Sequence, residues 1–115
     1  MASPAKFKKE LKLRMYAFFV LYFLRERNMS GYGLAKAIKR ETKGFFSSTP
    51  GNIYPVLKVL EVEGLVKSSS PSGKRRKTMY KITSKGKTTA VELAKSYKER
   101  FEKITSFFAK AVKRG

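Results

Sequence analysis

The sequence predicts a mainly α-helical protein with one small β-hairpin and a long C-terminal helix. Three observations predict this class. Several stretches carry apolar residues at helical spacing, the segment after residue 64 changes to the alternation of strands, and the C-terminal segment keeps a continuous heptad pattern. With 115 residues, the chain can bury one compact core but hardly two.

A first helix is expected over residues 7–27. Residues 15–24 within it are apolar on every side, which is typical of a helix surrounded by protein. This stretch is too short to span a membrane, which takes about 20 apolar residues, and no signal cleavage site follows it. We therefore expect a buried helix in a cytoplasmic protein that has no membrane partner.

Two shorter helices are expected over residues 31–42 and 50–63. Ser30 precedes the first of them and has a hydroxyl of the kind that caps helix N-termini. Gly64 follows the second and is placed to end it in the left-handed conformation that glycine adopts without strain. Both helices therefore have a residue at one end that suits that position.

The start of the helix at 50–63 is less regular. Thr49 followed by Pro50 is typical of an N-cap with proline in the first helical position. Pro55 lies deeper than a first turn, where proline removes a backbone hydrogen bond. Two alternatives stay open: the helix begins near Asn52, which places Pro55 in its first turn, or its start is bent.

Beyond Gly64, residues 65–69 and 77–82 are expected to form two strands joined by a basic turn. A helix over residues 84–113 follows and is long for so small a protein. We accordingly divide the chain into a domain over residues 1–83 and a C-terminal helix over residues 84–115.

The C-terminal helix has an apolar seam with the four-three spacing of helices that pack against another helix. A helix of about 30 residues is roughly 45 Å long, more than the small domain can cover. A second copy of the chain is the simplest partner, and the alternative is a helix that folds back on residues 7–27 alone. The seam expected to form the homodimer contains Ala90, Ala94, Tyr97, Phe101, Ile104, Phe108 and Ala111.

The charge indicates a polyanionic partner. The chain has 27 Lys and Arg against 8 acidic residues, a formal net charge of +19. Solubility of a small domain needs only about 2–8 units of charge, whereas neutralisation of phosphates uses a large excess. We expect double-stranded DNA as the partner; a membrane surface, an acidic protein or a purely solubilising role are the alternatives.

The amino-acid composition also excludes several kinds of catalytic and metal-binding site. The sequence has no Cys and no His, and all of its acidic residues are Glu. Disulfides, thiolate nucleophiles, imidazole catalysis and the usual metal sites are therefore absent. We expect neither an enzyme nor a cofactor.

Three helices followed by a hairpin with a basic tip is the element order of a winged helix-turn-helix, a DNA-binding architecture. In this architecture the helix at 50–63 enters the major groove, and the hairpin, or wing, reaches the DNA backbone or the minor groove. The helix N-terminus can bind a phosphate, and its outward side chains can contact bases. The expected contact residues are Ser48, Thr49, Asn52, Tyr54, Pro55, Lys58, Lys74, Arg75, Arg76 and Lys77.

The helix residues among these have structural alternatives. Asn52 could serve only to cap the helix, Tyr54 could cover the edge of the core, and Lys58 could be solvated. The cations of Lys74–Lys77 have no core to support, because they lie in a tight turn. We therefore expect phosphate contacts from the wing first.

Several motifs occur in a specific order along the chain. Gly31-Tyr32 opens a helix, Pro50-Gly51-Asn52-Ile53-Tyr54-Pro55-Val56-Leu57 forms the next, and Tyr80-Lys81-Ile82-Thr83 closes the wing before Gly86-Lys87. In this combination residues 31–87 resemble the PadR-type family of winged-helix transcriptional regulators. Met79 departs from the pattern, since many members have an aromatic residue there. The single C-terminal helix is similar to the short class of the family.

The resemblance implies a homodimeric DNA-binding repressor whose C-terminal region mediates dimerisation. It also adds Tyr32 to the expected DNA contacts. We expect a sequence-specific regulator of a palindromic operator that is associated with the nucleoid in the cytoplasm. The alternative is an architectural or chromatin-like protein that coats DNA with little sequence preference. RNA binding is a third, weaker alternative. A small aromatic effector could also bind between the helices at 7–27 and 84–113. The aromatic residues of these helices, however, could simply form an ordinary core.

Overall fold

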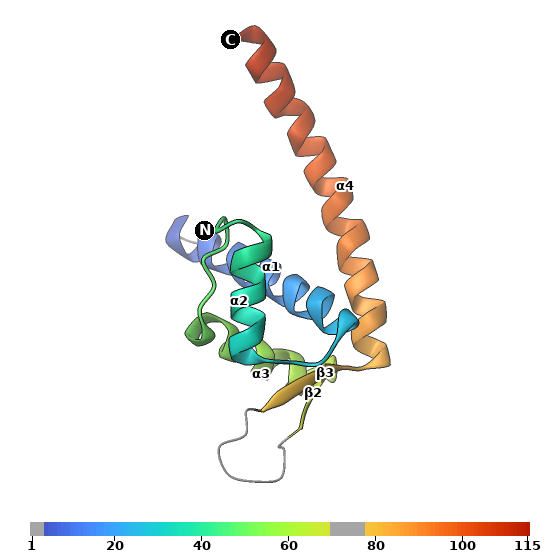
Figure 1. The fold of residues 1–115 in the computed structure, drawn as a ribbon. Helices are drawn as coiled ribbons and strands as arrows, with labels where there is room; N and C mark the ends of the chain where they lie inside the picture. The colour runs from blue at the N-terminus through green and yellow to red at the C-terminus, as the bar shows by residue number, and fades with distance from the viewer. Residues whose placement is uncertain (1–3, 70–77) are drawn as a thin grey trace.

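The computed structural model describes residues 4–69 and 78–115, with side chains from residue 12 onward. In Figure 1 the other helices gather beside a small sheet, while the C-terminal helix leaves them as a single rod. The mainly α class with a small hairpin is therefore confirmed. The elements in chain order are α1 (Pro4–Glu26), β1 (Met29–Ser30), α2 (Gly31–Glu41), α3 (Pro50–Val62), β2 (Val66–Ser69), β3 (Met79–Ile82) and α4 (Ser84–Arg114).

The core lies between α1, α2 and α3 and extends to the sheet. Residues 15–24 of α1 are covered on most sides, with Tyr22 exposed, whereas α2 and α3 contribute apolar side chains from one face. On α3 these are Ile53, Leu57 and Leu60, so the opposite face of this helix is left exposed. The largest fully buried side chains are Tyr16, Val20, Leu21, Leu34, Ile38, Ile53, Leu57 and Val66.

The predicted ends of the short helices are confirmed. The hydroxyl of Ser30 accepts a hydrogen bond from the backbone N–H of Gly33 at 3.0 Å and so caps α2. Gly64 has φ +77°, the left-handed conformation expected after α3. Thr83 caps α4 in the same way, accepting from the N–H of Gly86 at 3.0 Å.

Pro55 lies inside α3, which begins at Pro50. The alternative of a start near Asn52 is therefore wrong. The missing N–H of Pro55 would have bonded to the carbonyl of Gly51, and Gly51 is exposed, so water can satisfy this oxygen. The apolar stripe of α3 offsets the cost of the lost bond.

The sheet has three strands in the order β1-β3-β2, all antiparallel. The predicted hairpin is confirmed, with Val66 opposite Ile82 and Ser69 opposite Met79. The third strand was not predicted: β1 pairs Met29 with Tyr80. Two residues are too few to show strand alternation, so only the pairing across the fold reveals β1. The basic wing tip, Lys74–Lys77, lies outside the described residues.

The first turn of α4 lies directly on the backbone that follows α3. A Cβ atom placed on Gly86 would overlap the carbonyl oxygen of Leu65 and press on Ile82. The hydroxyl of Thr83 donates to the carbonyl of Gly64 at 2.7 Å in the same place. Within the described residues, no helix is both long and apolar enough to cross a membrane.

We predict that Gly86→Ala lowers the free energy of unfolding by about 1–3 kcal/mol, because the added methyl group meets backbone that cannot rotate away. Urea denaturation followed by circular dichroism measures this. Gly51→Ala is the control, since its Cβ would lie 3.7 Å from the nearest atom, the hydroxyl oxygen of Thr49. That substitution should leave stability unchanged or raise it by about 0.4–1 kcal/mol. Equal stability of both variants would contradict the close approach at Gly86.

Candidate nucleic-acid interface

The N-terminus of α3 is closed by a reciprocal capping box. The N–H of Asn52 donates to the Thr49 hydroxyl at 3.3 Å, and the N–H of Thr49 donates to the Asn52 side-chain oxygen at 3.2 Å. The Thr49 hydroxyl also donates to this oxygen at 2.9 Å. Both side chains are exposed, so the cap fixes their positions at the surface.

Asn52 therefore caps the N-terminus of α3, the structural role that the sequence left open. Its side-chain oxygen is used by the cap, which orients the amide group on the outside of the helix. An amide held in one orientation at a surface is suited to donate to a base edge without further loss of side-chain freedom. The capping role and a DNA contact are compatible at this residue.

Tyr54 lies on the flank of α3 that faces α2. Its ring covers Gly31, where an added Cβ would lie 2.7 Å from the ring carbon Cε1. The side chain is nevertheless 47% exposed. Tyr54 thus covers the edge of the core with one face of its ring and leaves the rest at the surface, beside Gly31 at the start of α2.

Tyr80 on β3 adds a second phenol to this edge. Partial burial, together with the neighbouring Tyr54 and Glu61, raises the pKa of the Tyr80 hydroxyl above its ordinary value of 10.0. The hydroxyl is therefore protonated in neutral solution and can act as a hydrogen-bond donor. From the sequence, Tyr80 was noted only as part of the motif that closes the wing and was not among the expected DNA contacts.

Lys58 and Pro55 are both exposed on the outer face of α3. Lys58 lies one turn beyond Tyr54 along the helix, as expected. Pro55 also borders an apolar groove of about 300 Å³ between α1 and α3, together with Leu13 and Val59. Pro55 is thus at the surface, but part of its ring faces this groove.

Ser48 differs from the expectation. Its side chain is buried, and its hydroxyl donates a hydrogen bond to the carbonyl of Ala35 on α2. This bond joins the loop before α3 to α2 and makes the hydroxyl inaccessible to DNA. The connector thus folds inward at this residue, and the expected DNA contact at Ser48, which is left to its backbone, stays a prediction.

The base of the wing is joined to α3 by Glu61. Its carboxylate accepts hydrogen bonds from the backbone N–H of Ser68 at 3.0 Å and from the Ser68 hydroxyl. The wing strands are therefore fixed relative to the recognition helix. The wing cations themselves lie outside the described residues, so their expected contacts stay predictions.

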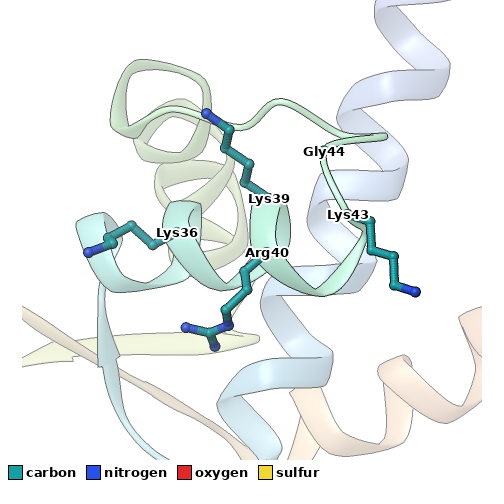
Figure 2. Close-up of a pocket in the computed structure, with 5 residues that line it drawn as sticks. All are labelled: Lys36, Lys39, Arg40, Lys43 and Gly44. Atoms are coloured by element: carbon teal, nitrogen blue, oxygen red, sulfur yellow. The ribbon is translucent and has the colours of Figure 1, made fainter.

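α2 carries cations that the sequence analysis did not assign to the site. Lys36, Lys39, Arg40 and Lys43 surround a shallow hollow of about 510 Å³ at the surface (Figure 2). The ammonium of Lys36 lies 5.4 Å from the centre of the Tyr32 ring, so this group begins beside an expected DNA contact. Their place on the side of α2 opposite its apolar residues, and just beyond its end, was the signal that could have found them.

α4 extends beyond the rest of the molecule. Every residue from Lys98 onward is exposed, and the longest dimension of the structure is 61 Å (Figure 1). The alternative of a helix folded back along its whole length on α1 is therefore wrong. The exposed large apolar side chains on this part are Phe101, Ile104, Phe107, Phe108 and Val112.

The first part of the predicted seam belongs to the core of the same chain. Ala90 is buried in the core cluster, and Tyr97 packs edge-to-face on Phe18 of α1 with ring centres 6.3 Å apart. The expectation that Ala90 lies in an interface with a second copy is therefore wrong. Beyond Tyr97, the seam does not pack on another helix or strand of the same chain within the described residues.

The helical body, the capped third helix and the adjoining hairpin define a winged helix-turn-helix protein. The model of the Transcriptional regulator PadR-like family matches residues 20–95, and the chain belongs to this family. The resemblance noted in the sequence is thereby confirmed. The members are transcriptional regulators, so the prediction that the protein is not an enzyme is confirmed as well.

Individual relatives agree with this membership. The negative transcriptional regulator PadR of Bacillus subtilis is 34% identical over 77 residues, which is 65% of this chain and 42% of the relative. The match thus spans less than half the length of that relative. The crystal structure of Bacillus subtilis PadR in complex with operator DNA superimposes with a TM-score of 0.59 at 31% identity, over 68% of this chain and 45% of that one.

Two further structures show the same fold over nearly their whole length. A transcriptional regulator from Clostridium thermocellum has a TM-score of 0.74 at 24% identity, covering 79% of this chain and 90% of that one. A PadR family transcriptional regulator from Eggerthella lenta has a TM-score of 0.73 at 22% identity, covering 90% of each chain.

We predict that Gly31→Ala destabilises the protein by about 1–3 kcal/mol, because the new methyl group would displace the ring of Tyr54. In a Tyr54→Ala background the same substitution should cost less than about 0.5 kcal/mol, since the space is then open. Urea denaturation of the four proteins in this cycle gives both values. The same cost in both backgrounds would show that Tyr54 is not held against Gly31.

Proposed function

We propose that the protein is a homodimeric repressor that binds a palindromic DNA operator through α3 and the basic wing. The observation that carries this proposal is the exposed N-terminal half of α3, which is capped and fixed beside the wing in a chain of net charge +19. The relative named as a negative regulator, and its structure with operator DNA, support the same role.

The contacts follow from the position of each side chain. The positive end of the α3 dipole, where the N–H of Gly51 and the Thr49 side chain lie, attracts a phosphate. Asn52 is held in the orientation of the cap and would donate to a base edge, whereas Lys58 would reach guanine or a phosphate. Tyr54 and Tyr32 supply hydroxyls at the edge nearest α2, and Lys74–Lys77 contribute phosphate contacts from the wing tip.

The dimer follows from the exposed end of α4. Phe101, Ile104 and Phe108 are 41%, 46% and 64% exposed, although they continue the heptad pattern. A second copy of α4 would bury this face and place two recognition helices about 34–36 Å apart, one turn of DNA. A palindromic operator has the same two-fold symmetry. Repression would follow when the dimer occupies this operator on the DNA in the cytoplasm.

The alternative function is a nucleoid-associated protein that coats DNA with little sequence preference. The large net charge favours it, because phosphate contacts alone give strong binding to any sequence. The fixed amide of Asn52 favours the specific regulator, since an oriented donor is of use only against a defined base edge.

A small aromatic effector is not needed by this proposal. α1 and α4 border a groove of about 280 Å³ that Phe18, Tyr22 and Ala94 line. The rings on its floor pack on one another, with Phe18 and Tyr22 centres 6.1 Å apart, as they do in an ordinary core.

We predict that selection from random duplexes yields a symmetric motif bound at least about 10³-fold more tightly than scrambled DNA. Asn52→Asp keeps an oxygen for the cap and removes the amide donor, so it should lower this preference about tenfold or more at unchanged stability. Arg75→Ala/Arg76→Ala should weaken binding to both DNAs alike. Equal affinity of the unchanged protein for both DNAs favours the coating protein instead.

We predict that Phe101→Glu/Ile104→Glu converts a dimer into monomers, because two carboxylates per chain would face each other in an apolar interface. Light scattering over a range of concentrations measures the mass. Lys103→Glu, on the opposite side of α4, serves as the control and should leave the dimer intact. A dimer that persists in the double variant would place the interface elsewhere.

A further inference from the structure

The outer face of α2 carries a row of cations that we call the basic stripe, defined as Lys36, Lys39, Arg40 and Lys43. All four are exposed: Lys36, Lys39 and Arg40 lie on the solvent side of α2, and Lys43 lies in the loop just beyond its C-cap, Thr42. The apolar side chains of α2 are buried on its opposite side. The stripe is therefore a charged surface, with the exposed ring of Tyr32 at its start.

The stripe begins at an expected DNA contact and leads away from it. Lys36 lies over the ring of Tyr32 at the start of α2, whereas Lys43 lies beyond its last residue, Glu41. Eleven residues of helix span about 16 Å. In Figure 1, α2 runs from the level of the sheet toward the opposite side of the helical body, so the stripe climbs the flank of the domain.

Acidic neighbours neutralise little of this charge. Arg40 pairs with Glu41 at 3.4 Å, but both side chains are more than half exposed, and such pairs contribute little. Among the described residues, no ion pair involves the three lysines of the stripe. Lys39 and Arg40 lie in the last turn, where cations favour the helix dipole, but Lys36 lies earlier and is not explained by it.

The side chains diverge. Figure 2 shows Lys36, Arg40 and Lys43 directed away from one another around the end of the helix. A small anion would need donors that converge on one point, whereas an extended polyanion can meet separated cations along its length. The arrangement fits a phosphate backbone better than a single phosphate group.

We propose that the basic stripe of α2 binds the phosphate backbone of duplex DNA that flanks the segment contacted by α3 and the wing. The inference rests on the proposed function, because it assumes that α3 lies on the DNA. A duplex that extends past the half-site and bends toward the flank of the domain would meet the stripe after Tyr32. The stripe then adds affinity without sequence preference and favours a bent duplex.

An anionic membrane is the rival partner, since Phe45 beside the stripe is 84% exposed. Membrane-surface helices, however, insert a broad apolar face next to their cations. On α2 this face is buried in the core, so among the described residues near the stripe Phe45 and the half-exposed Tyr32 offer far less than a broad apolar face. The observations therefore favour DNA.

The test compares a duplex of about 20 base pairs, which spans the two half-sites, with one of about 40 that adds flanks on both sides. The full-length variant Lys36→Ala/Lys39→Ala/Arg40→Ala/Lys43→Ala should lose at least about tenfold in affinity for the long duplex. Its plot of log affinity against log salt should become shallower by about 2–4, at roughly 0.9 per lost phosphate contact. On the short duplex both changes should be less than half as large.

The matched control removes four exposed lysines from the side of α4 opposite the predicted seam: Lys95→Ala, Lys103→Ala, Lys110→Ala and Lys113→Ala. It has the same net charge as the stripe variant and should keep most of the affinity for both duplexes. Circular dichroism melting of both variants confirms that they are folded.

Each outcome decides a different point. Equal losses on the two duplexes, or equal losses in the stripe variant and the control, would overturn the flanking contact while leaving the proposed function intact. Binding of the unchanged protein to vesicles of anionic lipid that only the stripe variant loses, with its DNA affinity unchanged, would assign the stripe to a membrane. Failure of the unchanged protein to bind either duplex would instead refute the proposed function.

Discussion

The burial of one side of α3 is the constraint on which the rest of the structure depends. Ile53, Leu57 and Leu60 are held among α1 and α2, so this helix can neither roll nor slide without exposing apolar surface worth several kcal/mol. Its N-terminus is closed by Thr49 and Asn52, and Glu61 bonds its other half to the wing. A helix fixed at both ends and along one side presents its remaining face in a single orientation.

The second constraint is the place where α3, the wing and α4 meet. Thr83 donates to the carbonyl of Gly64 and caps α4, while the absence of a side chain at Gly86 lets α4 lie against the backbone of Leu65. Because these residues share bonds, the direction in which α4 leaves the domain is linked to the position of the wing. The helix that would join two copies thus starts from the element that would contact DNA.

Local features of the sequence predicted much of this arrangement. Ser30, Thr49 and Gly64 mark helix ends because capping depends only on neighbouring residues. The heptad spacing of α4 is also a local pattern, whereas the α2 cations were not assigned to the site from the sequence. The family resemblance added Tyr32, a position that spacing alone did not indicate.

Features that depend on contacts across the fold could not be predicted. β1 exists only because β3 lies beside Met29 and Ser30, and Ser48 is buried because the carbonyl of Ala35 faces it. Ala90 continues the heptad pattern perfectly, yet it packs on its own chain, since a repeat does not say which helix will meet it. Sequence periodicity thus indicated a buried face but not its partner.

The exposed half of α4 has a consequence for the way such a protein can change. Since the side chains beyond Lys98 contribute nothing to the core of the described domain, substitutions there leave folding intact. Their apolar pattern alone would decide which copies associate. Duplicated genes could therefore acquire separate pairing preferences through this segment, each retaining the same winged-helix domain.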